Sequence, residues 1–174
     1  MIGFGHTSTG VLIGIGAIQF LPEKISTPTQ IFIVSLLGVI SHYITDFIPH
    51  GHYAIDPEKL TKKSLALFTL DTLGVAMFFL LIALYKYGLT SSFWLIAFAI
   101  TGAQLPDVWQ GINKLTRIKQ NTITRFESYL HSKIAHWHNP PNTPIPGGGR
   151  PWSKADIWQI SIFMFALWSV LFIG

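Results

Sequence analysis

The sequence contains no cysteine, which excludes disulfides, thiolate metal ligands and cysteine nucleophiles. It is also poor in charge, because Asp, Glu, Lys and Arg make up only 11% of its 174 residues. A soluble domain normally carries about 25% charged residues. Hydrophobic residues reach 49%, and the mean hydropathy is +0.43. This composition predicts an integral membrane protein, and the length favours one domain over residues 1–174.

Acidic residues are the scarcer charges, 8 against 12 Lys and Arg, and the formal net charge is +4. A basic balance can indicate a nucleic-acid partner, but here the basic residues lie between apolar runs. Orientation in a membrane explains that placement better. We therefore expect membrane lipid as the partner and no nucleic acid. The first residues carry no basic stretch, so we expect a membrane helix there rather than a cleaved signal peptide.

Long apolar runs predict the fold. A helix needs about 20 mostly apolar residues to cross a bilayer. Five segments approach this length, at 4–21, 30–49, 65–86, 91–108 and 155–173. A period near 3.6 predicts a further amphipathic helix on the membrane surface. Its apolar positions are Phe126, Tyr129, Leu130, Ile134 and Trp137. The sequence thus predicts an all-α polytopic bundle of about five transmembrane helices, with one surface helix in a loop at about 111–153.

The basic residues orient this bundle. Of the 12 Lys and Arg residues, only Lys24 and Lys86 lie in the connections after the first and third segments. All the others lie in the connections after the second and fourth segments. Basic loops tend to stay in the cytoplasm. We therefore expect the N-terminus and both long loops to face the cytoplasm and the C-terminus to face outwards.

The end of the second segment combines an apolar run with metal-capable groups. His42 and Asp46 are four residues apart, so a helix places them on one face. Pro49 is expected to loosen or end that helix, leaving His50 and His52 beyond it. The pair could instead be a hydrogen-bonded clasp between helices, but burying both groups in a bilayer is costly without a partner. We predict a metal site, with His50 slightly favoured over His52 as a further ligand.

Two further acids lie in or beside the apolar segments. Asp71 has no basic residue within a helical turn, so its carboxylate needs a metal, a histidine or water unless it is protonated and bonded to Ser or Thr. Asp107 follows Pro106, which is expected to break the fourth helix and let the carboxylate face inwards. Pro-Asp is also common in ordinary turns. We predict both acids as metal ligands, and an unligated one as general base.

Histidines complete the predicted site at the same, cytoplasmic end. His6 is followed at intervals of four by Gly10 and Gly14, a stripe that lets another helix approach closely and press on the histidine. Packing glycines beside a headgroup-level histidine are the alternative. His131 and His136 can border the site or belong to a solvated face. The predicted metal ligands are His6, His42, Asp46, His50, His52, Asp71, Asp107 and His136.

With these residues the chain resembles the bacterial membrane-bound metal-dependent hydrolases. The shared features are His6-Thr-Ser-Thr-Gly10, a Gly-x-x-Leu-Pro-Asp segment that ends at Asp107, and histidines near a helix end. The family's usual Leu-Pro-Asp-x-Asp has a second carboxylate where this chain has Trp109, so a second metal is not implied. The resemblance implies a hydrolase in the bacterial inner membrane.

A shorter resemblance joins the same residues. His42, Asp46 and His52 are similar to the His-x3-Asp-x5-His segment of zinc-dependent phospholipases C, in which these positions ligate zinc. The proline falls one position earlier here, and the N-terminal Trp ligand of that family is absent. The likeness covers about fifteen residues and implies metal-assisted hydrolysis as well.

The predicted function follows from the ligand chemistry and the membrane. Histidine and carboxylate ligands suit Zn²⁺, Mn²⁺ or Fe²⁺, and we favour zinc. Such a metal lowers the pKa of a bound water and so provides a nucleophile. A site at headgroup depth favours a lipid-borne ester or phosphoester as substrate. Two alternatives stay open: a small ion- or proton-coupled transporter, and a scaffold held by a structural metal or polar clasp.

Overall fold

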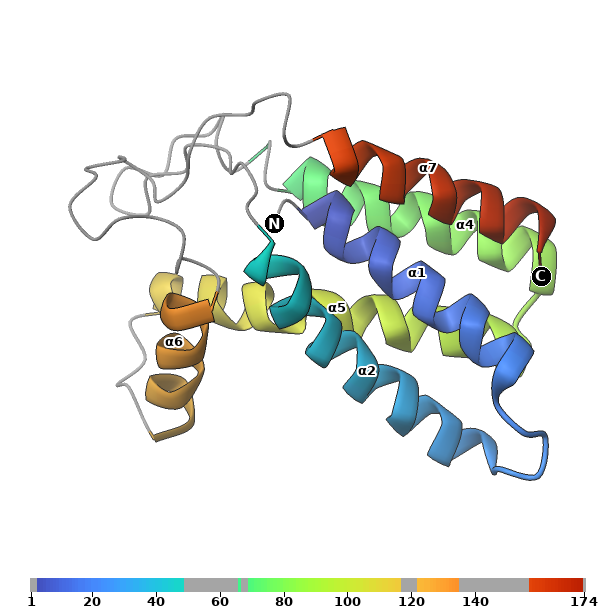
Figure 1. Ribbon diagram of the computed structural model, residues 1–174, viewed down its shortest axis with the longest axis horizontal. Coiled ribbons are helices and arrows are strands. Elements are labelled where there is room, and N and C mark those ends of the chain that lie inside the picture. The colour runs from blue at the N-terminus through green and yellow to red at the C-terminus, as the bar shows by residue number, and fades with distance from the viewer. Residues whose placement is uncertain (1–2, 49–65, 67–68, 117–121, 135–156, 174) are drawn as a thin grey trace.

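The computed structural model describes residues 3–48, 66, 69–116, 122–134 and 157–173. All of its elements within these ranges are helices, in agreement with the predicted all-α class. In chain order they are α1 (Gly3–Phe20), α2 (Thr27–Phe47), the π-helical turn η1 (Leu70–Gly74), α4 (Val75–Tyr87), α5 (Ser91–Thr116), α6 (Thr122–Ile134) and α7 (Ile157–Phe172). Figure 1 shows α1, α2, α4, α5 and α7 gathered in a bundle, with α6 at one end.

The five apolar segments of the sequence each coincide with a helix of the bundle, with η1 and α4 together forming the third. Two helices are long and apolar enough on their own to cross a membrane, Thr27–Phe47 and Leu70–Tyr87. Ile157–Phe172 is apolar but shorter. Two candidate spans are therefore shown, and crossing by all five helices stays a prediction.

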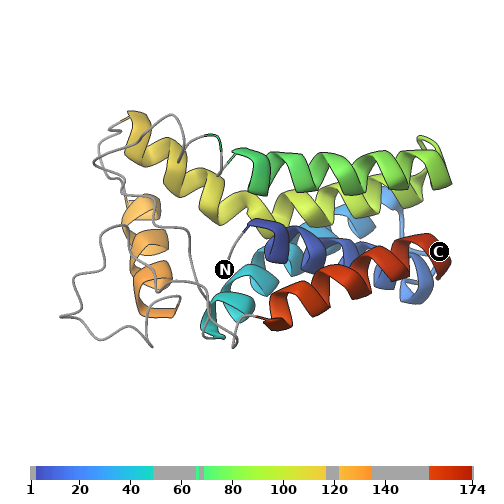
Figure 2. The same ribbon diagram turned by 90° about the horizontal axis from the view of Figure 1, so that it is seen from above.

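Helix α1 holds the bundle together, because it contacts α2, α4, α5 and α7. Figure 2 shows the same bundle from above, with α6 transverse to its long axis. Helix α2 also packs along α5. The three helices α1, α2 and α5 thus contact one another pairwise, and they carry His6, His42, Asp46 and Asp107.

Glycines allow this contact to be made at backbone distance. A Cβ atom added at Gly14 would lie 2.6 Å from the Cα atom of Ile96 on α5, and one at Gly10 would lie 2.7 Å from the Cα atom of Ile100. On α2, a Cβ at Gly38 would lie 2.6 Å from the carbonyl oxygen of Ala99. The predicted stripe of His6, Gly10 and Gly14 is therefore confirmed as a close-packing face.

The inside of the bundle holds buried polar side chains beside its apolar core, and many large apolar side chains are exposed on its outside. The buried polar residues include His6, Thr7, Ser8, His42, Asp46, Gln104 and Gln159. The exposed apolar residues include Phe32, Leu36, Ile40, Leu81, Phe165 and Trp168. A soluble domain buries most of its large aliphatic residues and rarely exposes wide apolar surface. Hydrocarbon surroundings favour the wide exposed apolar surface seen here.

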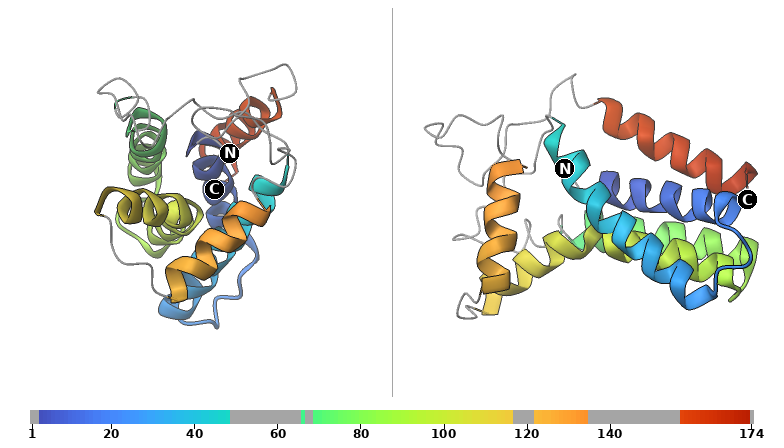
Figure 3. Two further views of the ribbon diagram at one scale, coloured as in Figure 1. Left: turned by 90° about the vertical axis from the view of Figure 1, so that its left-hand side faces the viewer. Right: turned by 60° about the horizontal axis from the view of Figure 1, so that its bottom comes forward.

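The two prolines that were expected to end helices behave differently. Helix α2 ends at Phe47, and Ile48 has φ −77° and ψ 129°, the extended conformation that a residue before proline prefers. Helix α5, however, continues through Pro106 to Thr116, so the expected break at Pro106 is wrong. Proline removes a single intrahelical hydrogen bond, and packing of α5 on α1 and α2 keeps the helix continuous. Figure 3 shows that α5 changes direction along its length.

We predict that Gly102→Ala lowers the free energy of unfolding by about 2 kcal/mol, a typical cost of overpacking. A Cβ atom there would meet the carbonyl oxygen of Ser35 on α2. The matched control is Gly16→Ala, because a Cβ at that helical position has nothing within 4 Å. The control should be neutral or stabilising by up to about 1 kcal/mol. Unfolding in detergent, followed by circular dichroism, measures both, and equal stability of the two variants would contradict the close contact.

Candidate metal centre

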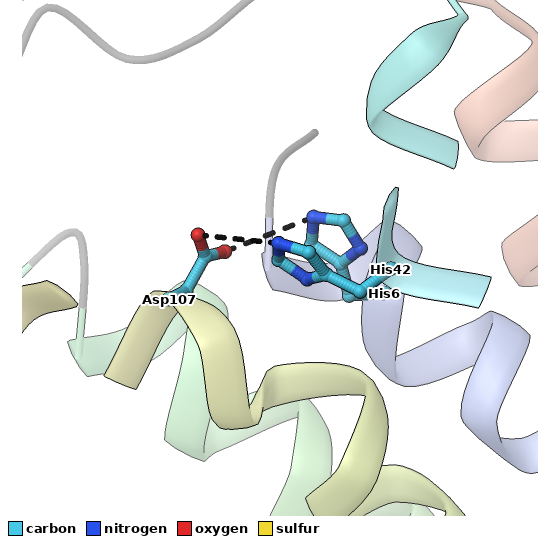
Figure 4. Close-up of side chains that lie close together, drawn as sticks. All are labelled: His6, His42 and Asp107. Atoms are coloured by element: carbon cyan, nitrogen blue, oxygen red, sulfur yellow. Dashed lines mark ion pairs between the residues drawn. The ribbon is translucent and has the colours of Figure 1, made fainter. Parts of the chain in front are cut away.

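The candidate site lies where α1, α2 and α5 meet at one end of the bundle. His6 comes from the beginning of α1, while His42 and Asp46 come from the last turns of α2. Asp107 follows Pro106 in the bent helix α5. Figure 4 shows the two imidazoles side by side, with the Asp107 carboxylate facing them. The structure therefore brings together four of the residues that the sequence predicts for the site.

The two imidazole rings are stacked. Their centroids are 4.0 Å apart, and the ring planes differ by 20°. Both side chains are almost fully buried, with 1% of His6 and none of His42 exposed. This arrangement places both Nε2 atoms near the same carboxylates, as the distances below show.

Asp46 and Asp107 each approach both histidines. The Oδ1 atom of Asp46 lies 3.2 Å from Nε2 of His6, and its Oδ2 atom lies 3.2 Å from Nε2 of His42. The oxygens of Asp107 lie 3.7 and 3.8 Å from the same two nitrogens. Asp46 is as deeply buried as the histidines, but 27% of Asp107 is exposed. Asp107 therefore forms the open side of the site.

The other ring nitrogens fix which tautomer each neutral histidine adopts. Nδ1 of His42 lies 2.9 Å from the carbonyl oxygen of Ala103, which can only accept, so Nδ1 carries the hydrogen. Nδ1 of His6 lies 3.2 Å from Oγ1 of Thr45. That hydroxyl has one hydrogen and donates it to its own helix, where the carbonyl oxygens of Ser41 and His42 lie 2.8 and 2.9 Å away. It must then accept from His6, so both neutral rings present an Nε2 lone pair.

Two lone pairs beside two carboxylates require positive charge between them. Protonating both rings would place two cations 4.0 Å apart in a buried site. A metal ion fits the donors: His6, His42 and Asp107 each offer a ligand atom, and these atoms lie within 4.8 Å of one another. Zinc bonds of about 2.0–2.1 Å put tetrahedral ligands about 3.3 Å apart. Asp46 lies 3.2 Å from both Nε2 atoms, close to that spacing, and so borders the group of three.

Asp71 is engaged elsewhere, at the beginning of α1. Its two carboxylate oxygens accept hydrogen bonds from the backbone N–H groups of Gly3, at 2.6 Å, and Phe4, at 3.1 Å. These N–H groups belong to the first turn of α1, where backbone N–H groups have no acceptor within the helix itself. Among the residues described, Asp71 lies outside the group that could hold a metal. Its contacts are those of a cap on α1, and its predicted part in metal binding or catalysis stays a prediction.

Two polar residues support the site that the sequence did not identify. Thr45 orients His6, as described above, and Gln104 joins three helical segments. The side-chain amide of Gln104 donates to Oγ1 of Thr7 and, at 3.0 Å, to the carbonyl oxygen of Thr72 in η1. A glutamine in an apolar segment was a usable signal, because it needs a partner in a membrane. Thr45 offered none, since threonines commonly bond to their own helix.

Three other predicted ligands, His50, His52 and His136, lie outside the described residues. Their ligand roles stay predictions. The side chain of His131 is not described either, although its backbone belongs to α6. Comparison with protein-family models, curated proteins and solved structures gives no match for this chain. The two family resemblances therefore stay predictions.

We predict that Asp71→Asn lowers the free energy of unfolding by about 1 kcal/mol, because the charged cap of α1 is lost. The variant should keep its metal content, since Asp71 bonds to the backbone of α1. Unfolding in detergent and elemental analysis of the same sample measure the two effects. Unchanged stability together with loss of metal would show that Asp71 is a ligand and not a cap.

Proposed function

We propose that this chain is a membrane-embedded, metal-dependent hydrolase whose metal binds to His6, His42, Asp46 and Asp107. One observation carries the proposal: each buried imidazole has an oxygen within hydrogen-bond distance of Nδ1, and both Nε2 atoms lie beside the same two carboxylates. Histidines that ligate metals commonly donate their other nitrogen to a carbonyl or similar acceptor. Zinc suits this donor set best, and Mn²⁺ or Fe²⁺ share the preference.

Asp107 is the residue best placed to take part in the reaction. Its oxygens are farther from the histidines than those of Asp46 and it is the exposed member of the group. A bound divalent metal activates water for attack near neutral pH. Asp107, once it leaves the metal and opens a position for that water, would be placed to take the proton of the water as general base, because solvent reaches this carboxylate. Asp46, with its two oxygens directed at the two imidazoles, would hold the centre together.

The surroundings support a substrate that reaches the site from a membrane. Large apolar side chains cover the outside of the bundle, and two of its helices are long and apolar enough to cross a bilayer. The site lies at one end of the bundle, with its open side at Asp107. We propose five membrane crossings in the bacterial inner membrane, with this end in the cytoplasm. A lipid-borne ester or phosphoester is the substrate class that such a position favours.

A structural clasp is the second candidate, and one observation favours it. The four side chains come from three helices. Those of His6, His42 and Asp46 are almost fully buried. A structural metal site uses the same ligands but leaves no position open for a substrate. The exposure of Asp107 favours the enzyme, and only an activity measurement separates the two.

We predict that the protein, purified in mild detergent after growth with added zinc or manganese, contains about one metal ion per chain, as a four-donor mononuclear site would hold. His42→Ala and Asp46→Asn should each lose most of it, because each removes a buried donor. Asp71→Asn is the matched control, an acidic residue that bonds to the α1 backbone. Elemental analysis by mass spectrometry gives the stoichiometry. A wild-type protein without stoichiometric metal would refute the metal centre.

Asp107→Asn tests whether the centre is catalytic. We expect this variant to retain metal through its other three donors and to lose hydrolysis of a lipid ester or phosphoester by about 10² to 10⁴-fold, the usual contribution of a general base. A panel of phospholipids in mixed micelles provides the substrates. A metal-loaded wild type that hydrolyses none of them would favour the clasp.

The orientation makes a separate prediction. Only Lys24 and Lys86 lie in the connections assigned to the outer side, so a reporter fused to Gly174 should lie outside the cytoplasm. Alkaline phosphatase fused there should be active, and green fluorescent protein should be dark. The opposite pattern would reverse the membrane orientation and leave the metal proposal intact.

A further inference from the structure

Helix α6 presents its apolar residues outwards. Phe126, a member of the predicted apolar stripe, is 62% exposed, and Ile123, three residues earlier on the same side of the helix, is 70% exposed. Thr124, a small polar residue, is only 2% exposed. An amphipathic helix of a soluble domain turns its apolar stripe towards the core. In α6 the apolar residues are instead turned away from the rest of the described chain.

The helical geometry separates the two faces. At about 100° per residue, Ile123, Phe126 and Leu130 fall within one sector of about 60°, and Thr124 lies about 130° from its centre. Helix α6 contacts α2 and α5, and the buried Thr124 marks the side turned towards the rest of the chain. The apolar stripe therefore has no large cover among the described residues. Its partner must come from outside this part of the chain.

The position of α6 indicates what that partner is. Figure 3 shows α6 running across the end of the bundle, transverse to the bundle helices. If those helices cross a bilayer, a transverse helix at their end lies parallel to the membrane plane. This is the orientation of an interfacial amphipathic helix, which buries its apolar side at the boundary between headgroups and acyl chains. The exposed apolar surface of the bundle would meet the same bilayer.

The positive charge of residues 111–134 favours one kind of bilayer over another. Residues 111–134 carry the basic residues Lys114, Arg117, Lys119, Arg125 and Lys133, and Glu127 is their one acidic residue. Arg125 is exposed. Basic residues beside an amphipathic helix are attracted to anionic headgroups. A strongly basic segment with an exposed apolar stripe thus fits an anionic lipid surface in both of its features.

We propose that α6 docks onto an anionic bilayer by inserting the stripe of Ile123, Phe126 and Leu130 into the headgroup–acyl boundary. The inference rests on the membrane embedding of the proposed function and is independent of the metal and of hydrolysis. It defines an interaction surface beside the site, because α6 lies at the end of the bundle where α2 carries His42 and Asp46. The docked helix holds that end of the bundle at headgroup level.

The cysteine-free chain allows a direct test with single spin labels. Ile123→Cys and Phe126→Cys report the stripe, and Arg125→Cys is the matched exposed control on the polar side of the same helix. The protein is reconstituted into vesicles of phosphatidylcholine with phosphatidylglycerol. Accessibility to oxygen, which concentrates in lipid, is compared with accessibility to a water-soluble nickel chelate. We expect the two stripe labels to favour oxygen and the control to favour nickel.

Nickel access at both stripe positions, or exclusion of both reagents from them, would overturn the proposal. Leu81→Cys on α4 separates this failure from failure of the proposed function, because Leu81 is exposed at the middle of an apolar helix. Oxygen access at Leu81 with nickel access at Phe126 would refute only the docking of α6. Nickel access at Leu81 would refute the membrane embedding itself. In vesicles of phosphatidylcholine alone, the labels at positions 123 and 126 should lie less deep in the bilayer. Equal depth in the two kinds of vesicle would refute the preference for anionic lipid.

Discussion

The sharing of one buried carboxylate by two stacked imidazoles is the constraint on which this structure depends. Asp46 lies 3.2 Å from both Nε2 atoms, and both Nδ1 atoms are already committed to acceptors. Neither ring can rotate to move its Nε2 atom away from Asp46 without breaking the hydrogen bond at its Nδ1 atom, which lies in a buried site. Positive charge must therefore enter the group, as a metal ion or as protons. The close packing of α1, α2 and α5 and the inward placement of polar side chains both serve to make that group possible.

Much of the fold could be predicted because long apolar helices leave a strong signal in the sequence. Each apolar segment of the sequence became a helix, and the amphipathic segment became α6. The expectation that failed was the break at Pro106, which depended on tertiary contacts. Pro49 follows the end of α2, whereas Pro106 lies inside α5, a helix that packs against α1 and α2. A single sequence does not reveal such neighbours.

The sequence predicts which residues form the candidate site, but it does not predict the hydrogen bonds that hold them. His6, His42, Asp46 and Asp107 were identified as polar groups that an apolar environment would not tolerate alone, and they lie together. The same reasoning selected Asp71, but the backbone of α1 satisfies that carboxylate. Burial cost shows that a partner is needed and does not show which one. The role of Thr45 depends on a hydrogen bond between two helices that no spacing within one helix predicts.

The backbone contacts at Gly14 and Gly38 bear on which ions the site can accept. Because α1 and α2 touch the backbone of α5 there, the donors cannot move apart without opening the helix interfaces. Calcium takes six to eight oxygen ligands at about 2.3–2.6 Å. A compact set with two nitrogen donors, fixed by touching main chains, discriminates against so large an ion. In this protein the selection of an ion by size would therefore be set by glycines along the helix interfaces, in addition to the residues that bind it.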